Sequence, residues 1–175
     1  MSIKIDRKWC MPNKNTFSMK PVSKLLNSYI SGNKVVVDPF ARNSKIGTIT
    51  NDLNPNTSAM YHLDALDFLK NQPTNSADIV LYDPPYSSRQ VSECYNNVGH
   101  KVTTLDTSAR WRKNHLDEIK RILKHNGICI SFGWNTNGVG KTRGFEIIQI
   151  LILAHGGSHN DTLVTVERKV EEDEK

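Results

Sequence analysis

The sequence is poor in cysteine and has no long apolar run. Its three cysteines, Cys10, Cys94 and Cys129, lie far apart and form no CxxC pair, which argues against a disulfide framework and against a thiolate zinc site. No apolar run approaches the roughly 18 residues of a membrane-spanning helix, and the polar start of the chain does not resemble a secretory signal. We therefore expect a protein of the reducing cytoplasm with no membrane association.

Acidic residues are fewer than basic ones. The 175 residues include 18 Asp and Glu against 23 Lys and Arg, which gives a net charge of +5. The end of the chain is mostly acidic, so the remainder is more basic than this total. We expect residues 1–168 to form one domain and residues 169–175 to form an acidic, disordered tail. A basic domain suits a polyanionic partner such as nucleic acid.

Short β-branched strands alternate with amphipathic helices along the chain. Apolar side chains at i, i+3 and i+4 predict helices at residues 21–31, 65–71 and 111–125. Apolar runs predict strands at residues 35–37, 46–50, 79–82, 128–132, 146–154 and 162–167. A short helix could form at residues 56–61, and residues 87–108 are predicted to be mostly loop. This alternation predicts an α/β fold with a mostly parallel sheet and a C-terminal antiparallel hairpin.

Carboxylates follow three of the predicted strands, at Asp38, Asp52 and Asp83. In open α/β sheets, ligands bind outside the carboxyl ends of the strands. We therefore expect these three side chains to share one crevice, because three carboxylates at one edge are costly unless they bind something.

The segment Asp83-Pro84-Pro85-Tyr86 has the residues needed to methylate an exocyclic base amine. The amine nitrogen must become more sp³-like as it attacks, and acceptors aimed at its N–H bonds favour that change. The Asp83 carboxylate and the Pro84 carbonyl can supply two acceptors, and the two prolines fix the backbone. Tyr86 offers a flat face on which a base can stack. The alternative is a simple turn that ends a strand.

With this tetrad the chain resembles the N6-adenine-specific DNA methyltransferases, a family of amino-methyltransferases with many stand-alone members in phages. The resemblance covers roughly residues 10–168. It implies a Rossmann-like class I methyltransferase fold, S-adenosyl-L-methionine as cofactor and direct transfer without a metal. It also implies DNA as the partner, in the cytoplasm of a bacterial cell or a phage-infected host.

Residues of the cofactor site are also implied by the resemblance. They are Phe17, Asp38, Phe40, Asp52, Asp64, Ala65 and Asp83. The carboxylate of Asp52 would accept two ribose hydroxyls, and Asp64 would hold the adenine amino group. Asp52 and Asp64 could instead cap helices, and Phe40 could belong to the core.

The chain departs from the family in the loop after Asp38. Ala41, Arg42 and Asn43 stand where glycines are typical, so the path of this loop is an open question.

Basic and aromatic residues alternate over residues 87–115, as in segments that close on a nucleic-acid backbone. The expected nucleic-acid contacts are Tyr86, Arg89, Lys101, Arg110 and Arg112. An ordinary solvated loop is the alternative. We find no segment long enough for a large target-recognition region, so we expect either relaxed specificity or a very short site recognised by residues 87–115 and 133–144. The histidines of residues 155–161 are expected to lie in a turn at the substrate rim rather than to bind a metal.

Related functions remain open at this point. Related tetrads occur in enzymes that methylate cytosine N4 in DNA or an amine in RNA, such as guanine N2 or adenine N6. A catalytically silent nucleic-acid-binding module of the same fold is a further alternative, against which the complete tetrad argues. The pattern assigns no oligomeric state.

Overall fold

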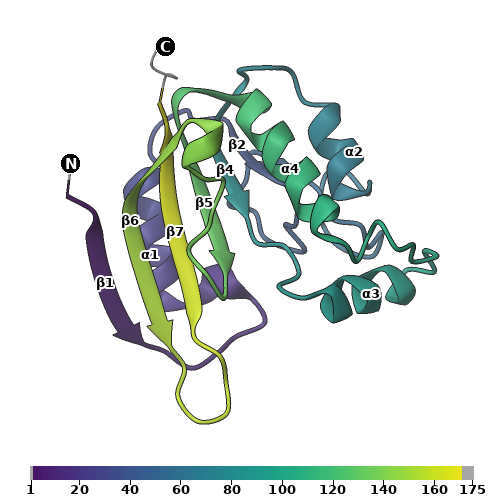
Figure 1. Ribbon diagram of the computed structural model, residues 1–175, viewed down its shortest axis with the longest axis horizontal. Helices are drawn as coiled ribbons and strands as arrows, with labels where there is room; N and C mark the ends of the chain where they lie inside the picture. Colours follow the sequence, from purple (N-terminus) through teal and green to yellow (C-terminus); the bar gives the residue numbers. More distant parts are fainter. Residues whose placement is uncertain (1, 171–175) are drawn as a thin grey trace.

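A seven-stranded mixed sheet forms the centre of the molecule (Figure 1). The structure is a computed structural model that describes residues 2–170. Its strands are β1 (Lys4–Trp9), β2 (Val36–Asp38), β3 (Ile49–Thr50), β4 (Ala77–Tyr82), β5 (Leu123–Gly133), β6 (Phe145–Ala154) and β7 (Thr162–Lys169). Their order is β1-β6-β7-β5-β4-β2-β3, and every pairing is parallel except the two made by β7. The predicted α/β fold with a C-terminal antiparallel hairpin is therefore confirmed.

Helices cover both faces of this sheet. They are α1 (Lys20–Tyr29), α2 (Ala65–Lys70), α3 (Ser88–Asn97) and α4 (Ala109–Ile122), with short 3₁₀ turns η1 (Thr16–Ser18) and η2 (Lys141–Arg143). Figure 1 shows α1 behind the sheet and α4 in front of it, with α2 beside α4. Among residues 2–170, no helix combines the length and apolar composition that a membrane crossing requires.

Strand β4 joins the two cores that these layers create. Its side chains alternate, as a strand requires: Leu81 packs with α1 in one cluster, and Val80 and Tyr82 pack with α2 and α4 in the other. All three side chains are fully buried. Because β4 leads directly into Asp83, the position of that residue is set by a strand buried on both sides.

Two elements appear where the pattern predicts none. Strand β1 has the sequence KIDRKW, is almost wholly exposed and pairs only with β6, so it lacks the apolar run of a buried strand. Helix α3 occupies the predicted loop. The Ser87 hydroxyl caps it by accepting from the Gln90 amide at 3.3 Å, and only Val91 and Tyr95 are buried in it. Two buried positions are too few to produce a visible period.

Other expectations are corrected at their boundaries. No helix forms at residues 56–61, where Tyr61 instead makes an isolated parallel bridge to Asn51. Helix α4 ends at Ile122, three residues before the predicted end at residue 125. Asn126 has φ +60° within β5, at the place where the register with β4 shifts. Strand β7 extends to Lys169, and residues 171–175 of the predicted tail lie outside the described residues.

Candidate active site

A three-chambered cleft opens at the carboxyl edge of strands β2, β3 and β4. The N-terminal chamber has a volume of about 370 Å³ and is lined by residues 14–18, residues 40–46 and Asp83. The narrow chamber, of about 70 Å³, lies between α2, α3 and α4 and is lined by Asp52, Asp64, Ala65, Tyr95, Trp111 and their neighbours. The tetrad chamber, of about 420 Å³, contains the whole tetrad. Phe40 lines all three, so the chambers adjoin.

The tetrad connects β4 to α3 and is held by two side-chain hydrogen bonds. The Tyr86 hydroxyl donates to Asp83 Oδ1 at 2.7 Å, and the Tyr86 amide donates to Gln90 Oε1 at 2.7 Å. Burial raises the pKa of Asp83, although hydrogen bonds from the hydroxyls of Tyr86 and Thr16 and the nearby Arg42 charge lower it again. The result is an ionisable carboxyl in a fixed, partly dry position.

Asp38 lies beneath the cleft and is fully buried. Its Oδ1 accepts from the Phe40 amide at 3.1 Å, while its buried Oδ2 has no hydrogen-bond partner among the described residues. Burial raises the pKa of Asp38 well above its usual range, and the charges of Asp83 and Asp52 raise it further. The charges of Asp52 and Asp83 are therefore close enough to affect Asp38. Only Asp52 and Asp83 line the cleft, so the expectation that all three carboxylates share one crevice is not met for the fully buried Asp38.

Arg42 takes the backbone conformation that a glycine would have provided. Its φ is +53°, and its amide donates to Asp52 Oδ2 at 3.0 Å. The guanidinium donates to the Lys14 carbonyl at 2.6 Å, which ties this loop to the N-terminal segment. The loop therefore follows a glycine-like path at Arg42 without a glycine.

Asp52 and Asp64 differ in the roles that the structure gives them. No helix begins at Asp52, so the helix-cap alternative is wrong there; its two oxygens accept from the amides of Arg42 and Asn54 at 3.0 and 2.9 Å. Asp64 does cap α2, with Oδ1 accepting from Leu66 at 2.9 Å. Its Oδ2 accepts from the Tyr95 hydroxyl, so Asp64 caps a helix and lines the narrow chamber at the same time.

Phe40 also serves two environments. Its ring lies 5.8 Å from that of Tyr82, 6.1 Å from Trp111 and 5.8 Å from His115, which places it in an aromatic cluster. Of this cluster, Phe40 alone lines all three chambers, and Trp111 lines the narrow one. Phe17, the other aromatic residue predicted here, lines the N-terminal chamber and packs on Phe132 at 5.2 Å.

The predicted nucleic-acid contacts are not gathered in one place. Arg112 lies over the Tyr82 ring at 5.3 Å and borders a cavity of about 200 Å³ beside Tyr86. Arg89 is exposed on α3 and is paired with Glu93 at 2.8 Å. Lys101 and Arg110 are exposed in or next to the segment between α3 and α4, outside the three chambers.

A buried histidine, His155, links the hairpin between β6 and β7 to the N-terminal segment. His155 Nδ1 contacts the Cys10 carbonyl at 2.7 Å, and its Nε2 contacts the Thr162 hydroxyl at 2.9 Å. Within residues 2–170, no group of three or more His, Cys, Asp or Glu side chains could hold a metal ion. His155 therefore joins the N-terminal segment to β7.

Two residues of this region escape the sequence patterns. Cys94 lines both the narrow and the tetrad chambers, although its thiol belongs to a helix predicted as loop. Trp134 follows β5 directly, and its ring lies 5.7 Å from that of Tyr86 at an angle of 73°. The rule that selects Asp38 and Asp83, namely the position just after a predicted buried strand, selects Gly133 here, because the predicted strand ends at residue 132 whereas β5 ends at Gly133.

Replacement of Asp38 by asparagine tests how much the buried carboxylate reduces the stability of the folded protein. Because the pKa is raised in the folded state, ionised Asp38 destabilises the cofactor-free protein as pH rises above the ordinary carboxyl range. Asparagine keeps the acceptor for Phe40 but carries no charge. We expect the melting temperature of the variant to exceed that of the wild type by about 2–4 °C at pH 8, with the difference vanishing near pH 4. Calorimetric scans at both pH values check this, and an equal gain at both would contradict it.

Comparisons with known proteins concern the fold. No protein-family model and no curated protein matches the sequence. The 1,6-didemethyltoxoflavin-N1-methyltransferase of Burkholderia thailandensis, solved with bound S-adenosylhomocysteine, is 12% identical with a TM-score of 0.59, over 87% of this chain and 78% of that chain. An S-adenosylmethionine-dependent methyltransferase from Methanosarcina mazei is 11% identical with a TM-score of 0.59, over 85% and 98%. TrmN from Thermus thermophilus is 15% identical with a TM-score of 0.56, over 87% and 49%. The chain has the Rossmann-like fold of class I methyltransferases.

Proposed function

We propose that this protein is an S-adenosylmethionine-dependent methyltransferase that acts on the N6 amino group of adenine in DNA. One observation carries the proposal. A proline-locked turn holds Asp83, hydrogen bonded to Tyr86, at the wall shared by the N-terminal and tetrad chambers. An acceptor between two adjoining chambers is what a transfer between a cofactor and a second molecule requires.

The residues around the cleft fit this cofactor. Its sulfonium and ammonium groups are cationic, and a cation in the cleft would relieve the repulsion that the neighbouring carboxyl groups exert on the buried Asp38. Asp52, at the border of two chambers, would accept the ribose hydroxyls. Asp64 and Ala65 would enclose the adenine in the narrow chamber.

The methionine end would then occupy the N-terminal chamber, where Phe17 and the cations Lys14 and Arg42 lie. The fold's neighbour from Burkholderia thailandensis, which binds S-adenosylhomocysteine, supports the assignment of the cofactor class.

The chemistry then depends on how the tetrad holds the amine. When bound, S-adenosylmethionine would supply an electrophilic methyl group, and the electrons of its carbon–sulfur bond would remain on the sulfur. Asp83 and the Pro84 carbonyl would each accept a hydrogen bond from an N–H group of the amine. These bonds favour a lone pair localised on the nitrogen rather than in the base ring, and they stabilise the positive charge that develops there. Because burial raises the pKa of Asp83, its carboxylate is also a stronger proton acceptor than an exposed one. Tyr86 would hold the extruded base by stacking.

The tetrad favours the N6 amine of adenine over other base amines. In the family that the chain resembles, Asp at the first position of the tetrad is commonest among the adenine enzymes. The basic composition suits a nucleic acid. Tyr86 lines the tetrad chamber and Arg112 borders the cavity beside it, whereas Arg89, Lys101 and Arg110 are exposed outside the three chambers. A related amine in RNA, or cytosine N4, is the second candidate, because their enzymes carry related tetrads.

Methyl transfer by the purified protein tests the proposal. Calorimetry should first show binding of S-adenosylmethionine. Labelled methyl groups should then enter unmethylated DNA, with DNA already methylated at adenine N6 and RNA of the same sequence as matched controls. Transfer to RNA alone would replace the proposed substrate by the second candidate. Cofactor binding without transfer to either polymer would contradict the enzyme assignment and favour a silent nucleic-acid-binding module.

A further inference from the structure

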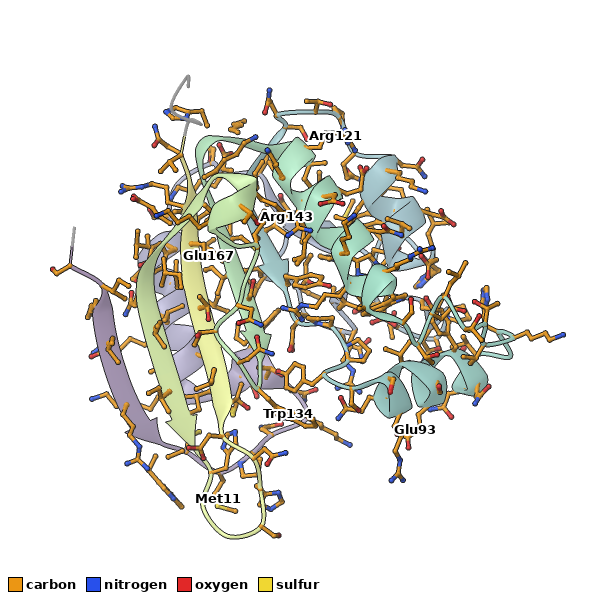
Figure 2. The ribbon with its side chains drawn as sticks, in the orientation of Figure 1. Met11, Glu93, Arg121, Trp134, Arg143 and Glu167 are labelled. Atoms are coloured by element: carbon orange, nitrogen blue, oxygen red, sulfur yellow. The ribbon has the colours of Figure 1, made fainter. Side chains whose placement is uncertain are left out.

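The indole of Trp134 is solvent-exposed and lies against Tyr86 of the tetrad. Trp134 is 44% exposed and follows Gly133, the last residue of β5, at the same edge of the sheet as Asp83. Figure 2 labels Trp134 between the hairpin near Met11 and the helix that bears Glu93. The Tyr86 ring lies against it at 5.7 Å in an edge-to-face arrangement.

The segment that bears Trp134 is anchored by a buried carboxyl. Glu167, on β7, accepts from the amides of Val139 and Gly140 at 2.6 and 3.0 Å. Gly138 has φ +52°, and a Cβ there would lie 2.0 Å from the Glu167 carboxylate, so this loop packs tightly on it. Arg143 adds a bond to the Val139 carbonyl and one to Asp117 of α4, at 3.2 and 2.7 Å.

These anchors leave Trp134 between the end of a strand and a fastened loop (Figure 2). A side chain whose position is already restricted loses little conformational entropy when a flat ligand stacks on it. Tyr86 lines the tetrad chamber, whereas Trp134 is not among its lining residues. Trp134 therefore contacts Tyr86 from outside that chamber. If a polymeric substrate places one base in the chamber, its neighbouring nucleotides must also lie outside it.

We infer that the exposed face of Trp134 binds the nucleobase adjacent to the target in an unpaired or locally opened strand. This inference rests on the proposed function, since it needs a target base in the tetrad chamber. Stacking on an aromatic residue is available to every base, so the contact adds affinity without selecting a sequence. It would help a small enzyme to hold its strand without a separate recognition region.

A double-mutant cycle tests the inference, in which one change is Trp134→Ala and the other is an abasic site in the DNA. The probe is a short single-stranded DNA oligonucleotide with one adenine, intact or with an abasic site on either side of that adenine. We expect Trp134→Ala to raise the KM for the intact oligonucleotide by about 5- to 100-fold, with kcat and the cofactor Kd little changed. An abasic site on the contacted side should raise the wild-type KM similarly and should add little in the variant.

Two further variants separate stacking from other effects. Trp134→Phe should restore part of the lost affinity because it retains an aromatic face. Trp9→Ala is the matched control, because Trp9 is 67% exposed on the distant edge strand β1 and should leave the KM unchanged.

Additive losses from Trp134→Ala and the abasic sites would overturn the inference while the proposed function stands. Failure of the wild type to methylate any DNA oligonucleotide would overturn the proposed function itself.

Discussion

Asp83→Ala is expected to lower kcat by about 10³-fold and to leave the Kd for S-adenosylmethionine within about threefold of the wild type. The carboxylate is the acceptor that favours the reactive form of the amine, and this interaction strengthens only as charge develops on nitrogen. Steady-state methyl transfer with saturating cofactor and DNA measures kcat, and calorimetry measures the Kd.

Two milder variants show which property of Asp83 matters. Asp83→Asn keeps an oxygen for the Tyr86 hydroxyl but loses the charge, so its kcat should fall between those of Asp83→Ala and the wild type. Tyr86→Phe removes only that hydroxyl and keeps the ring, so it should cost about tenfold or less. A large loss of cofactor affinity in Asp83→Ala would mean that Asp83 holds the cofactor rather than the amine.

Ala65→Leu is expected to weaken cofactor binding by about 100-fold or more. Ala65 begins α2 and lines the narrow chamber of about 70 Å³, in which three added carbon atoms would take the place assigned to the adenine ring. A loss of this size corresponds to the burial of one aromatic ring. Calorimetric titration with S-adenosylmethionine checks the affinity.

The free energy of unfolding shows whether Ala65→Leu fills the adenine site or misfolds the protein. Leucine is a strong helix former and fills an existing cavity, so the free energy of unfolding should be unchanged or about 1 kcal/mol higher. Ala65→Gly is the matched control: it should destabilise α2 by about 1 kcal/mol and leave the cofactor Kd nearly unaltered. Unimpaired binding by the leucine variant would place the adenine elsewhere.

The sheet and the edge that bears the cleft were predictable because buried strands leave a strong local pattern. Residues 79–82, directly before Asp83, are all apolar and buried because this part of β4 is covered on both faces, and in such sheets ligands bind at the edge where the strands end. The hairpin of β6 and β7 was predictable for the same reason, with Gly156 and Gly157 both at positive φ in its turn.

Contacts between distant segments left no comparable pattern. Strand β1 is polar because only one neighbour and one face constrain it, and α3 buries only two side chains. The pairing of Tyr95 with Asp64 joins residues 31 positions apart, and that of Trp134 with Tyr86 depends on the order of strands in the sheet. The glycine-like path at Arg42 rests on bonds to Asp52 and Lys14, which no local rule anticipates.

Nucleoside analysis of cellular DNA tests the central claim most directly. The wild-type chain and Asp83→Ala would be expressed in a host that lacks adenine methylation, and the digested DNA would be analysed by mass spectrometry. N6-methyldeoxyadenosine should appear with the wild type and be absent with the variant. Methylation at another base position, or equal amounts of N6-methyldeoxyadenosine with both proteins, would contradict the claim that Asp83 presents an adenine amine to the cofactor.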